Sequence, residues 1–315
     1  MIHVACSADH RLAGDCAVML RSLLTTNRDQ PITVHFLHDQ RLAAADLDGL
    51  RVVVEGAGGT WQPHLVTPTE GQFPWTDRYG FSAWYRILLP DVLSDLDRVI
   101  YLDADLLILG SLAELWRLPL EGASIAAVTQ PTLPEVLPRL RDLGLPHAGR
   151  YFNSGVMVMD LRRLREDGRV AQVAELIRSA AVDMPWADQD PLNAVLHDER
   201  LELHPRWNVM TPVFDLPARM LPWTADAIDE AKTSPAVVHF IGEFKPWHYR
   251  CHHPYRQAWF DQLAATPFAG RPIEGRTLTH VLLRPLPPRW QPRVEASVRR
   301  LAARGRRTIL RRGPL

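Results

Sequence analysis

The N-terminal part of the sequence alternates short apolar segments with longer amphipathic ones, and this alternation constrains the fold more than any other feature. Ile2–Ser7, Ile32–Leu37 and Arg51–Val54 have the pattern of strands, whereas Ala13–Leu24 and Arg41–Leu50 carry apolar residues at helical spacing. Alternating strands and helices build a mainly parallel, twisted sheet with helices on both faces. The sequence therefore predicts an α/β fold, in which ligands bind at the carboxyl ends of the strands.

The later part of the chain continues this pattern. We expect helices over Phe81–Leu89, Val170–Ala181 and Gln189–His197, and strands over Arg98–Leu102, Ile125–Val128, Phe152–Met159 and Val237–Ile241. Residues 131–150 are rich in Pro, Gly and Leu, which predicts a loop or short helix over the sheet. We predict one domain over residues 1–265 and a Pro/Arg-rich C-terminal tail over residues 266–315.

Composition excludes several other classes of protein. The 315 residues contain 36 basic and 36 acidic side chains, so the net charge is zero and argues neither for nor against nucleic-acid binding. Cys6, Cys16 and Cys251 are too few and too widely spaced for a disulfide framework or a zinc site, and we expect reduced thiols. The N-terminus lacks the pattern of a signal peptide, and no apolar run is long enough to cross a bilayer. These features predict a cytoplasmic protein.

A pair of carboxylates follows the most apolar strand. The segment Arg98–Leu102 ends at Asp103-Ala-Asp105, and residues at i and i+2 of an extended backbone face the same side. Asp103 and Asp105 can therefore point at one hard divalent cation, which would bridge them to a substrate phosphate. Two acids in a solvated turn are the alternative interpretation.

A second polar cluster lies in His239-Phe-Ile-Gly-Glu-Phe-Lys-Pro-Trp247. His239 ends a strand, Gly242 allows a close approach of the backbone to a ligand, and Lys245 is one of two lysines in the chain. An ammonium group beside a diphosphate stabilises the charge of a leaving group. An imidazole with two carboxylates suits Mn²⁺ better than Mg²⁺. A hydrogen-bonded core histidine is the alternative for His239.

These two segments resemble glycosyltransferase family 8, which includes lipopolysaccharide galactosyl- and glucosyltransferases and has glycogenin as a relative. Four further segments match family motifs in the same order: Ser82–Arg86, Phe152–Val156, Asp188–Asp190 and His204–Asn208. The resemblance covers roughly residues 1–260, and the tail carries no family motif.

The resemblance implies a GT-A fold and a set of site residues. Asp103, Asp105 and His239 would bind Mn²⁺, with Mg²⁺ as the alternative, and a UDP-sugar would be the donor. Gly242 and Lys245 would hold the diphosphate, and Ser7 and Asp9, at the end of the first strand, would lie at the nucleotide. The transferred sugar would be surrounded by Arg86, Asn153, Asp188 and Gln189.

The reaction implied is retaining transfer of a hexose, galactose or glucose, to a hydroxyl group of a glycan, glycolipid or other acceptor. Retention requires either a protein nucleophile, for which Gln189 and Asp188 are candidates, or attack of the acceptor from the face of the leaving phosphate. We favour same-face attack, because an amide is a poor nucleophile. A catalytically silent, nucleotide-sugar-binding scaffold of the same fold is the alternative. A two-metal phosphohydrolase is disfavoured, because the sequence shows no second carboxylate cluster.

The tail combines many arginines with Trp290 and with apolar residues at helical spacing, Val294, Val298 and Leu301. A basic amphipathic helix of this kind is typical of proteins that bind an anionic membrane surface. We therefore expect a protein that is cytoplasmic or peripheral on the inner face of the plasma membrane. A disordered basic tail is the alternative, and nucleic acid is not an expected partner.

Overall fold

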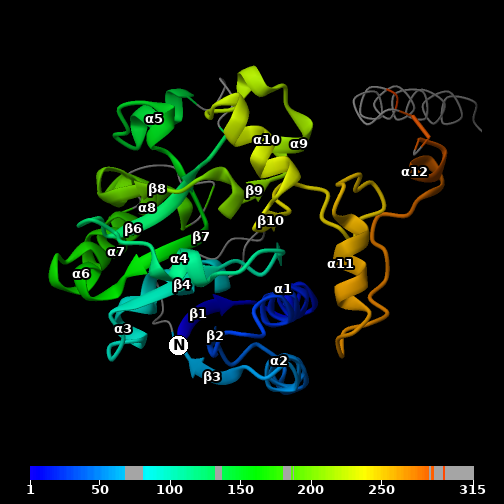
Figure 1. Ribbon diagram of the computed structural model, residues 1–315, viewed down its shortest axis with the longest axis horizontal. Coiled ribbons are helices and arrows are strands. Elements are labelled where there is room, and N and C mark those ends of the chain that lie inside the picture. The colour runs from blue at the N-terminus through cyan, green and yellow to red at the C-terminus, as the bar shows by residue number, and fades with distance from the viewer. Residues whose placement is uncertain are drawn as a thin grey trace, which may run out of the picture.

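A central seven-stranded sheet organises the chain (Figure 1), in the strand order β3-β2-β1-β4-β7-β6-β8. The computed structural model describes residues 1–67, 81–131, 137–179, 186, 188–283, 285–286 and 294. The strands of this sheet are β1 (Ile2–Ser7), β2 (Ile32–His38), β3 (Thr60–Leu65), β4 (Arg98–Leu102), β6 (Ile125–Thr129), β7 (Phe152–Asp160) and β8 (Arg200–Glu202).

Within this sheet β7 runs against its neighbours. It is antiparallel to β4 and to β6, whereas the pairs β1–β2, β2–β3, β1–β4 and β6–β8 are parallel. Because β7 is reversed, its first residues lie beside the last residues of β4: Leu102 pairs with Val156, and the Asp103 N–H donates to the Gly155 carbonyl at 2.8 Å. The predicted mainly parallel α/β sheet is confirmed.

A smaller sheet brings distant residues to the end of β4. It contains β5 (Leu106–Ile108), β9 (Val209–Met210) and β10 (Val237–His239), in the order β5-β10-β9. Strand β10 is antiparallel to β5, and His239 pairs with Leu106. Since Leu106 directly follows Asp105, this register places His239 beside the predicted pair of carboxylates.

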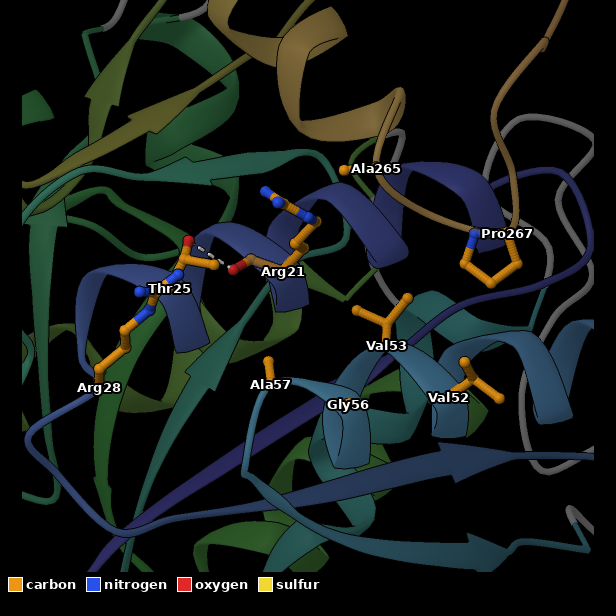
Figure 2. A pocket seen from close by; sticks show the side chains of 9 residues that line it. All are labelled: Arg21, Thr25, Arg28, Val52, Val53, Gly56, Ala57, Ala265 and Pro267. Atoms are coloured by element: carbon orange, nitrogen blue, oxygen red, sulfur yellow. Dashed lines mark hydrogen bonds between the residues drawn. The ribbon is translucent and has the colours of Figure 1, made fainter.

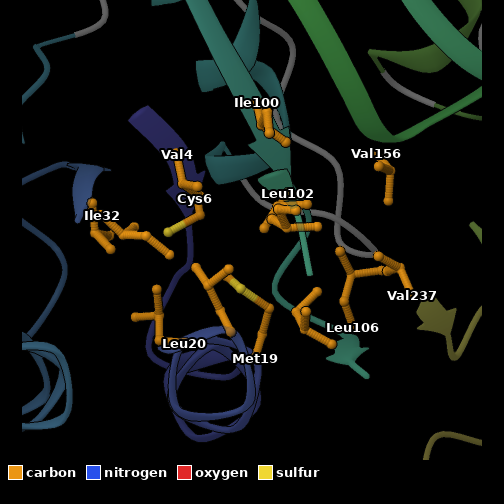
Figure 3. Packing of buried hydrophobic residues seen from close by; sticks show 14 of the residues in the cluster. Val4, Cys6, Met19, Leu20, Ile32, Ile100, Leu102, Leu106, Val156 and Val237 are labelled. Carbon is orange, nitrogen blue, oxygen red and sulfur yellow. The ribbon is translucent and has the colours of Figure 1, made fainter. Parts of the chain in front are cut away.

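One face of the central sheet is covered by α1 (Ala13–Thr26) and α2 (Ala44–Gly56). Figure 3 shows Met19 and Leu20 of α1 pointing toward Val4 and Cys6 of β1. Complete burial of a side chain of this size stabilises the fold by about 1.5–3 kcal/mol.

The opposite face is covered by the 3₁₀ helix η1 (Ser82–Leu88), α3 (Leu89–Val92), α6 (Leu161–Glu166), α7 (Arg169–Ser179) and α8 (Gln189–Leu196). The buried side chains of Trp84 and Tyr85 pack there with Tyr101 and Met157 of the sheet. Helices thus lie on both faces, as the sequence predicts.

The remaining described helices are peripheral. They are α4 (Ala113–Arg117), α5 (Leu137–Asp142), η3 (Ala148–Arg150), η4 (His197–Glu199), η5 (Pro205–Trp207), α9 (Pro212–Asp215), η6 (Ala218–Met220), α10 (Ala225–Thr233), α11 (Arg256–Leu263) and α12 (Leu278–Leu283). The region expected to be a loop or short helix contains α5 and η3, although residues 132–136 lie outside the described part.

Helix α11 packs against α1, and the chain then runs back alongside α11 toward α12 (Figure 1). A cavity of about 420 Å³ opens where α1 and α2 meet the residues that follow α11 (Figure 2). Arg21, Arg28, Val52 and Pro267 are among the residues that line it.

Two of the local predictions are corrected by the structure. Residues 51–54 are not a strand but part of α2, in which Leu50, Val53 and Val54 are buried at helical spacing. The third strand begins later, after Gly58, whose φ of +85° suits glycine. The helix expected over Phe81–Leu89 is a 3₁₀ helix followed by the short α3, which has Pro90 in its first turn.

Three histidines form a row across the sheet that pattern analysis does not detect. His3 Nδ1 lies 3.0 Å from His35 Nε2, and His35 Nδ1 lies 3.0 Å from His64 Nε2. Parallel pairing of β1, β2 and β3 brings these three rings side by side. Burial lowers the pKa of all three imidazoles, to about 4 for His35, so the row is neutral at pH 7.

The three cysteines are free and buried. None of the helices in the described residues has the length and apolar character needed to cross a membrane. Within the predicted tail, α12 exposes Leu278 and Leu282. The amphipathic stretch around Trp290 and Leu301 lies outside the described residues.

Candidate active site

A cavity of about 790 Å³ lies at the carboxyl ends of β1 and β4 and at the start of β7. It brings together all the predicted site residues except Asp9: Ser7, Arg86, Asp103, Asp105, Asn153, Asp188, Gln189, His239, Gly242 and Lys245. Residues that are far apart in the sequence therefore face one space.

The metal-binding prediction matches a compact cluster. Asp103, Asp105 and His239 each offer one ligand atom, and these atoms lie within 4.8 Å of one another. His239 Nε2 is 3.1 Å from Asp105 Oδ1 and 3.8 Å from Asp103 Oδ2. Two carboxylate oxygens and one imidazole nitrogen fit a divalent cation of the Mn²⁺ type. Although burial favours the neutral acid, the Lys245 ammonium holds the pKa of Asp105 far below its usual range.

Gly155 makes this convergence sterically feasible. A Cβ atom at this position would lie 2.3 Å from His239 Cε1 and 2.7 Å from Asp103 Oδ2. Both distances are shorter than van der Waals contact, so a side chain here would displace two of the three candidate ligands.

Arg86 joins the side of the cavity that contains Asp103 to the side that contains Asp188. Its Nη2 donates to Asp103 Oδ1 at 2.7 Å, and its Nε lies 2.9 Å from Asp188 Oδ2. The Tyr101 hydroxyl also donates to Asp103, at 2.9 Å, and the guanidinium stacks 4.3 Å above the Tyr101 ring. Burial raises the pKa of Asp188 to about 7, although Arg86 opposes this shift.

Lys245 and Gly242 lie on the loop that follows β10. The Lys245 ammonium donates to Asp105 Oδ2 and to the Phe240 carbonyl. Gly242 has a φ of +97°, a conformation that favours glycine. The positive charge is thus held beside the candidate metal ligands.

A chain of hydrogen bonds orients the side-chain amides of Asn153 and Gln189, which lie on the same side of the cavity as Asp188. Asn153 Nδ2 donates to Gln189 Oε1 at 3.1 Å, and Gln189 Nε2 donates to the Tyr151 hydroxyl at 2.9 Å. Tyr151 donates in turn to Asp190 Oδ1 at 2.8 Å. Each amide therefore has one defined orientation, set by buried partners.

Ser7 and Asp9 are placed differently. The Ser7 hydroxyl donates to the Ser82 carbonyl at 2.9 Å and lines the cavity. The Asp9 carboxylate accepts hydrogen bonds from Arg11 Nε and from the Leu12 N–H, at 2.9 and 3.2 Å, and does not line the cavity. The role of Asp9 at the nucleotide stays a prediction.

Sequence reasoning missed several residues that support the site, namely Tyr101, Tyr151, Ser154, Gly155 and Asn208. Four of them carried a signal, because Tyr101, Ser154, Gly155 and Asn208 lie within segments that matched the family, but the matches suggested no function for them. The contact of Asn208 with His239 becomes visible only when η5 and β10 are placed side by side.

The fold defined by these elements is also found in a solved structure. The solved structure of galactosyltransferase LgtC in complex with donor and acceptor sugar analogs superposes with a TM-score of 0.74 and 24% identity, over 84% of this chain and 96% of that one. The predicted GT-A fold is confirmed.

Comparison of the sequence with known proteins agrees with the comparison of the fold. Residues 3–251 match the family described as Glycosyl transferase family 8, and the chain belongs to this family. It is 35% identical to General stress protein A of Bacillus subtilis over 192 residues, 59% of this chain and 65% of that protein, so it spans less than two thirds of that relative. It is also 26% identical to a lipopolysaccharide 1,2-glucosyltransferase of Escherichia coli over 259 residues, 78% of this chain and 73% of that protein.

Proposed function

We propose that this protein transfers a hexose, galactose or glucose, from a UDP-sugar to a hydroxyl group of a glycan, glycolipid or other acceptor, with retention of configuration. The supporting observation is the convergence of the Asp103–Asp105–His239 cluster with Lys245 in one cavity. The names of two similar proteins, a galactosyltransferase and a glucosyltransferase, support a hexose donor.

The charged residues suit a leaving diphosphate. Asp103, Asp105 and His239 would hold Mn²⁺, with Mg²⁺ as the alternative, and the bound ion would neutralise charge on the diphosphate. Lys245 adds a positive charge at the same place. Arg86 pairs with both Asp103 and Asp188, which keeps its guanidinium fixed between the metal ligands and the sugar-facing residues.

The hydrogen bonds of Gln189 and Asp188 support same-face attack. Gln189 Oε1 accepts from Asn153 Nδ2 and from the Ser154 N–H, and Asp188 Oδ2 pairs with Arg86 and accepts from the Ser154 hydroxyl. Oxygens engaged in this way are weak nucleophiles. In same-face attack the acceptor oxygen bonds to the anomeric carbon as the carbon–phosphate oxygen bond breaks, and the acceptor proton passes to the phosphate.

The C-terminal part supports a location at a membrane surface. Leu278 and Leu282 of α12 are 85% and 77% exposed, and an arginine-rich sequence follows them. Exposed apolar side chains beside basic residues favour contact with anionic lipid. We propose a cytoplasmic enzyme that works at the inner face of the membrane.

Calorimetric titration with UDP, UDP-galactose, UDP-glucose, UDP-N-acetylglucosamine and GDP-mannose, each with and without Mn²⁺, tests the donor site. We expect a UDP-sugar to bind the wild type only with Mn²⁺, and Asp105→Asn to lose this binding, because an amide is a weak metal ligand. Asp226→Asn, at an exposed position of α10, is the matched control.

Binding that ignores both the metal and Asp105 would refute the proposed site. Slow release of free hexose from the bound donor, absent in Asp105→Asn, would separate an enzyme from a silent nucleotide-sugar-binding scaffold.

A further inference from the structure

The segment that follows α11 lies against the loop that carries Lys245. The Glu274 N–H donates to the Trp247 carbonyl at 2.9 Å, and the Tyr249 N–H donates to the Glu274 carbonyl at 2.8 Å. These two bonds form a parallel β-bridge between His248 and Glu274. This segment lies beyond residue 251, where the family match ends, and in Figure 1 it is the orange chain beside α11.

Arg271 is one of the side chains through which this segment contacts the rest of the fold. Its guanidinium carbon lies 4.1 Å from the centre of the Trp247 ring, and Trp247 also contacts Trp259 at 5.4 Å between ring centres. Arg271 Nη1 donates to Asp15 Oδ2 of α1 at 2.6 Å, and Nη2 donates to the Arg11 carbonyl at 3.4 Å. One side chain therefore joins α1, the turn before α1 and the Lys245 loop.

The contact with Asp15 differs from an ordinary surface ion pair. Asp15 is completely buried, and its Oδ1 has no hydrogen-bond partner among the described residues. Burial raises the pKa of Asp15 to about 8, while Arg271 lowers it. Arg271 Nη1 donates to the buried Asp15 Oδ2 whether or not the carboxyl group is ionised, and this hydrogen bond fixes the guanidinium against α1.

The two segments joined by Arg271 are those expected to hold the two ends of UDP. Asp9 lies in the turn before α1, where Arg11 binds its carboxylate, and Lys245 lies two residues before Trp247. We propose that Arg271 is a positioning residue that orders the Lys245 loop against the turn before α1 and thereby prepares the nucleotide site. This inference rests on the proposed UDP-sugar donor. Order established before binding raises affinity, because no loop entropy is lost on binding.

The test uses the full-length protein in an Asp15→Asn background, because Arg271→Ala alone would remove a hydrogen-bond partner from the buried Asp15 carboxyl group. Asp15→Asn/Arg271→Ala is compared with Asp15→Asn, and Arg276→Ala in the same background controls for loss of an exposed arginine nearby. Two quantities are measured: amide hydrogen exchange of residues 242–255 without ligand, and the Kd for UDP with Mn²⁺.

We expect the double variant to exchange the Tyr249 amide about tenfold faster and to bind UDP about tenfold more weakly, which corresponds to loss of a partly desolvated cation–π contact. Unchanged exchange, or faster exchange with an unchanged Kd, would overturn the proposal, and a lower Tm alone would show a merely structural role. If Asp15→Asn and the wild type both fail to bind UDP, the proposed donor is wrong. The exchange rates still show in that case whether Arg271 orders the Lys245 loop.

Discussion

His239 donates a hydrogen bond from Nδ1 to the side-chain oxygen of Asn208, at 2.9 Å. Because an amide oxygen only accepts, the imidazole proton lies on Nδ1, and the Nε2 lone pair faces Asp103 and Asp105. Asn208 Nδ2 donates in turn to Asn153 Oδ1 at 2.7 Å. The completely buried Asn208 therefore sets both the tautomer and the orientation of a candidate metal ligand.

Asn208→Leu, a change of similar volume, should weaken Mn²⁺ binding by about 10- to 100-fold, because His239 loses the partner that orients it. Titration of Mn²⁺ in the presence of UDP, followed by electron paramagnetic resonance, measures this affinity. Asn27→Leu is a matched control, since Asn27 is equally buried but bonds to Leu23 and Leu112. Equal Mn²⁺ affinity in the two variants would contradict the assigned role.

Gly155→Ala should disrupt the same cluster by steric overlap. The new methyl group would meet His239 and Asp103, and we expect a loss of about 1–3 kcal/mol in the free energy of unfolding together with weaker Mn²⁺ binding. Gly56→Ala, at the end of α2, meets no atom within 4 Å and should be neutral or stabilise by at most about 1 kcal/mol. Urea unfolding compares the two, and equal stabilities would show that the close approach at Gly155 is not needed.

Lys245→Met should lower kcat by about 10²–10³-fold at saturating donor and Mn²⁺, because the ammonium would stabilise charge that develops on the leaving diphosphate. Steady-state kinetics of hexose transfer or donor hydrolysis measure this effect. Lys232→Met, which changes the other lysine of the chain in α10, should leave kcat unchanged. A rise in KM with kcat intact would assign Lys245 to donor binding alone.

The histidine row predicts a loss of stability in mild acid. The folded-state pKa values of His3, His35 and His64 are lowered, so below pH 6.5 the unfolded chain binds protons that the folded chain does not. The free energy of unfolding should therefore fall as the pH drops from about 6.5 to about 4, where His35 itself becomes protonated.

Urea unfolding at pH 7.5, 6 and 5 tests this dependence. His35→Asn should be less stable at pH 7.5 but should lose less stability on acidification than the wild type. His10→Asn, at an exposed position, should keep the wild-type slope. Because Asp15 and Asp188 titrate in all three proteins, the difference in slope isolates the histidines. Equal slopes would refute the interpretation.

The fold could be predicted, and the residues that line the candidate site could be named, because their signals are local. An apolar strand that ends in Asp103 and Asp105 needs only a few neighbouring residues to be recognised. The same reasoning was wrong for residues 51–54, since a run of valines suits a strand as well as the buried side of a helix. Only the packing of Val53 and Val54 under the sheet decides between the two.

The residues that sequence reasoning missed act through contacts between distant segments. Asn208 meets His239, and His3 meets His35 and His64, only through strand pairing and register. Arg271 lies in a stretch that carries no motif. Its proposed positioning role rests on its contact with Asp15, whose complete burial the sequence does not reveal. Hydrophobic pattern and motif spacing carry no information about such pairs.

The reversed direction of β7 and the late position of β10 also determine when the site can form during synthesis. Asp105 and His239 are separated by 134 residues, and the strand that carries Gly155 lies between them in the sequence. A nascent chain synthesised as far as Asp105 contains both carboxylates before Gly155 and His239 have been added. High-affinity binding of a divalent cation should thus await nearly the whole domain, and incomplete chains released from the ribosome should compete poorly for such cations.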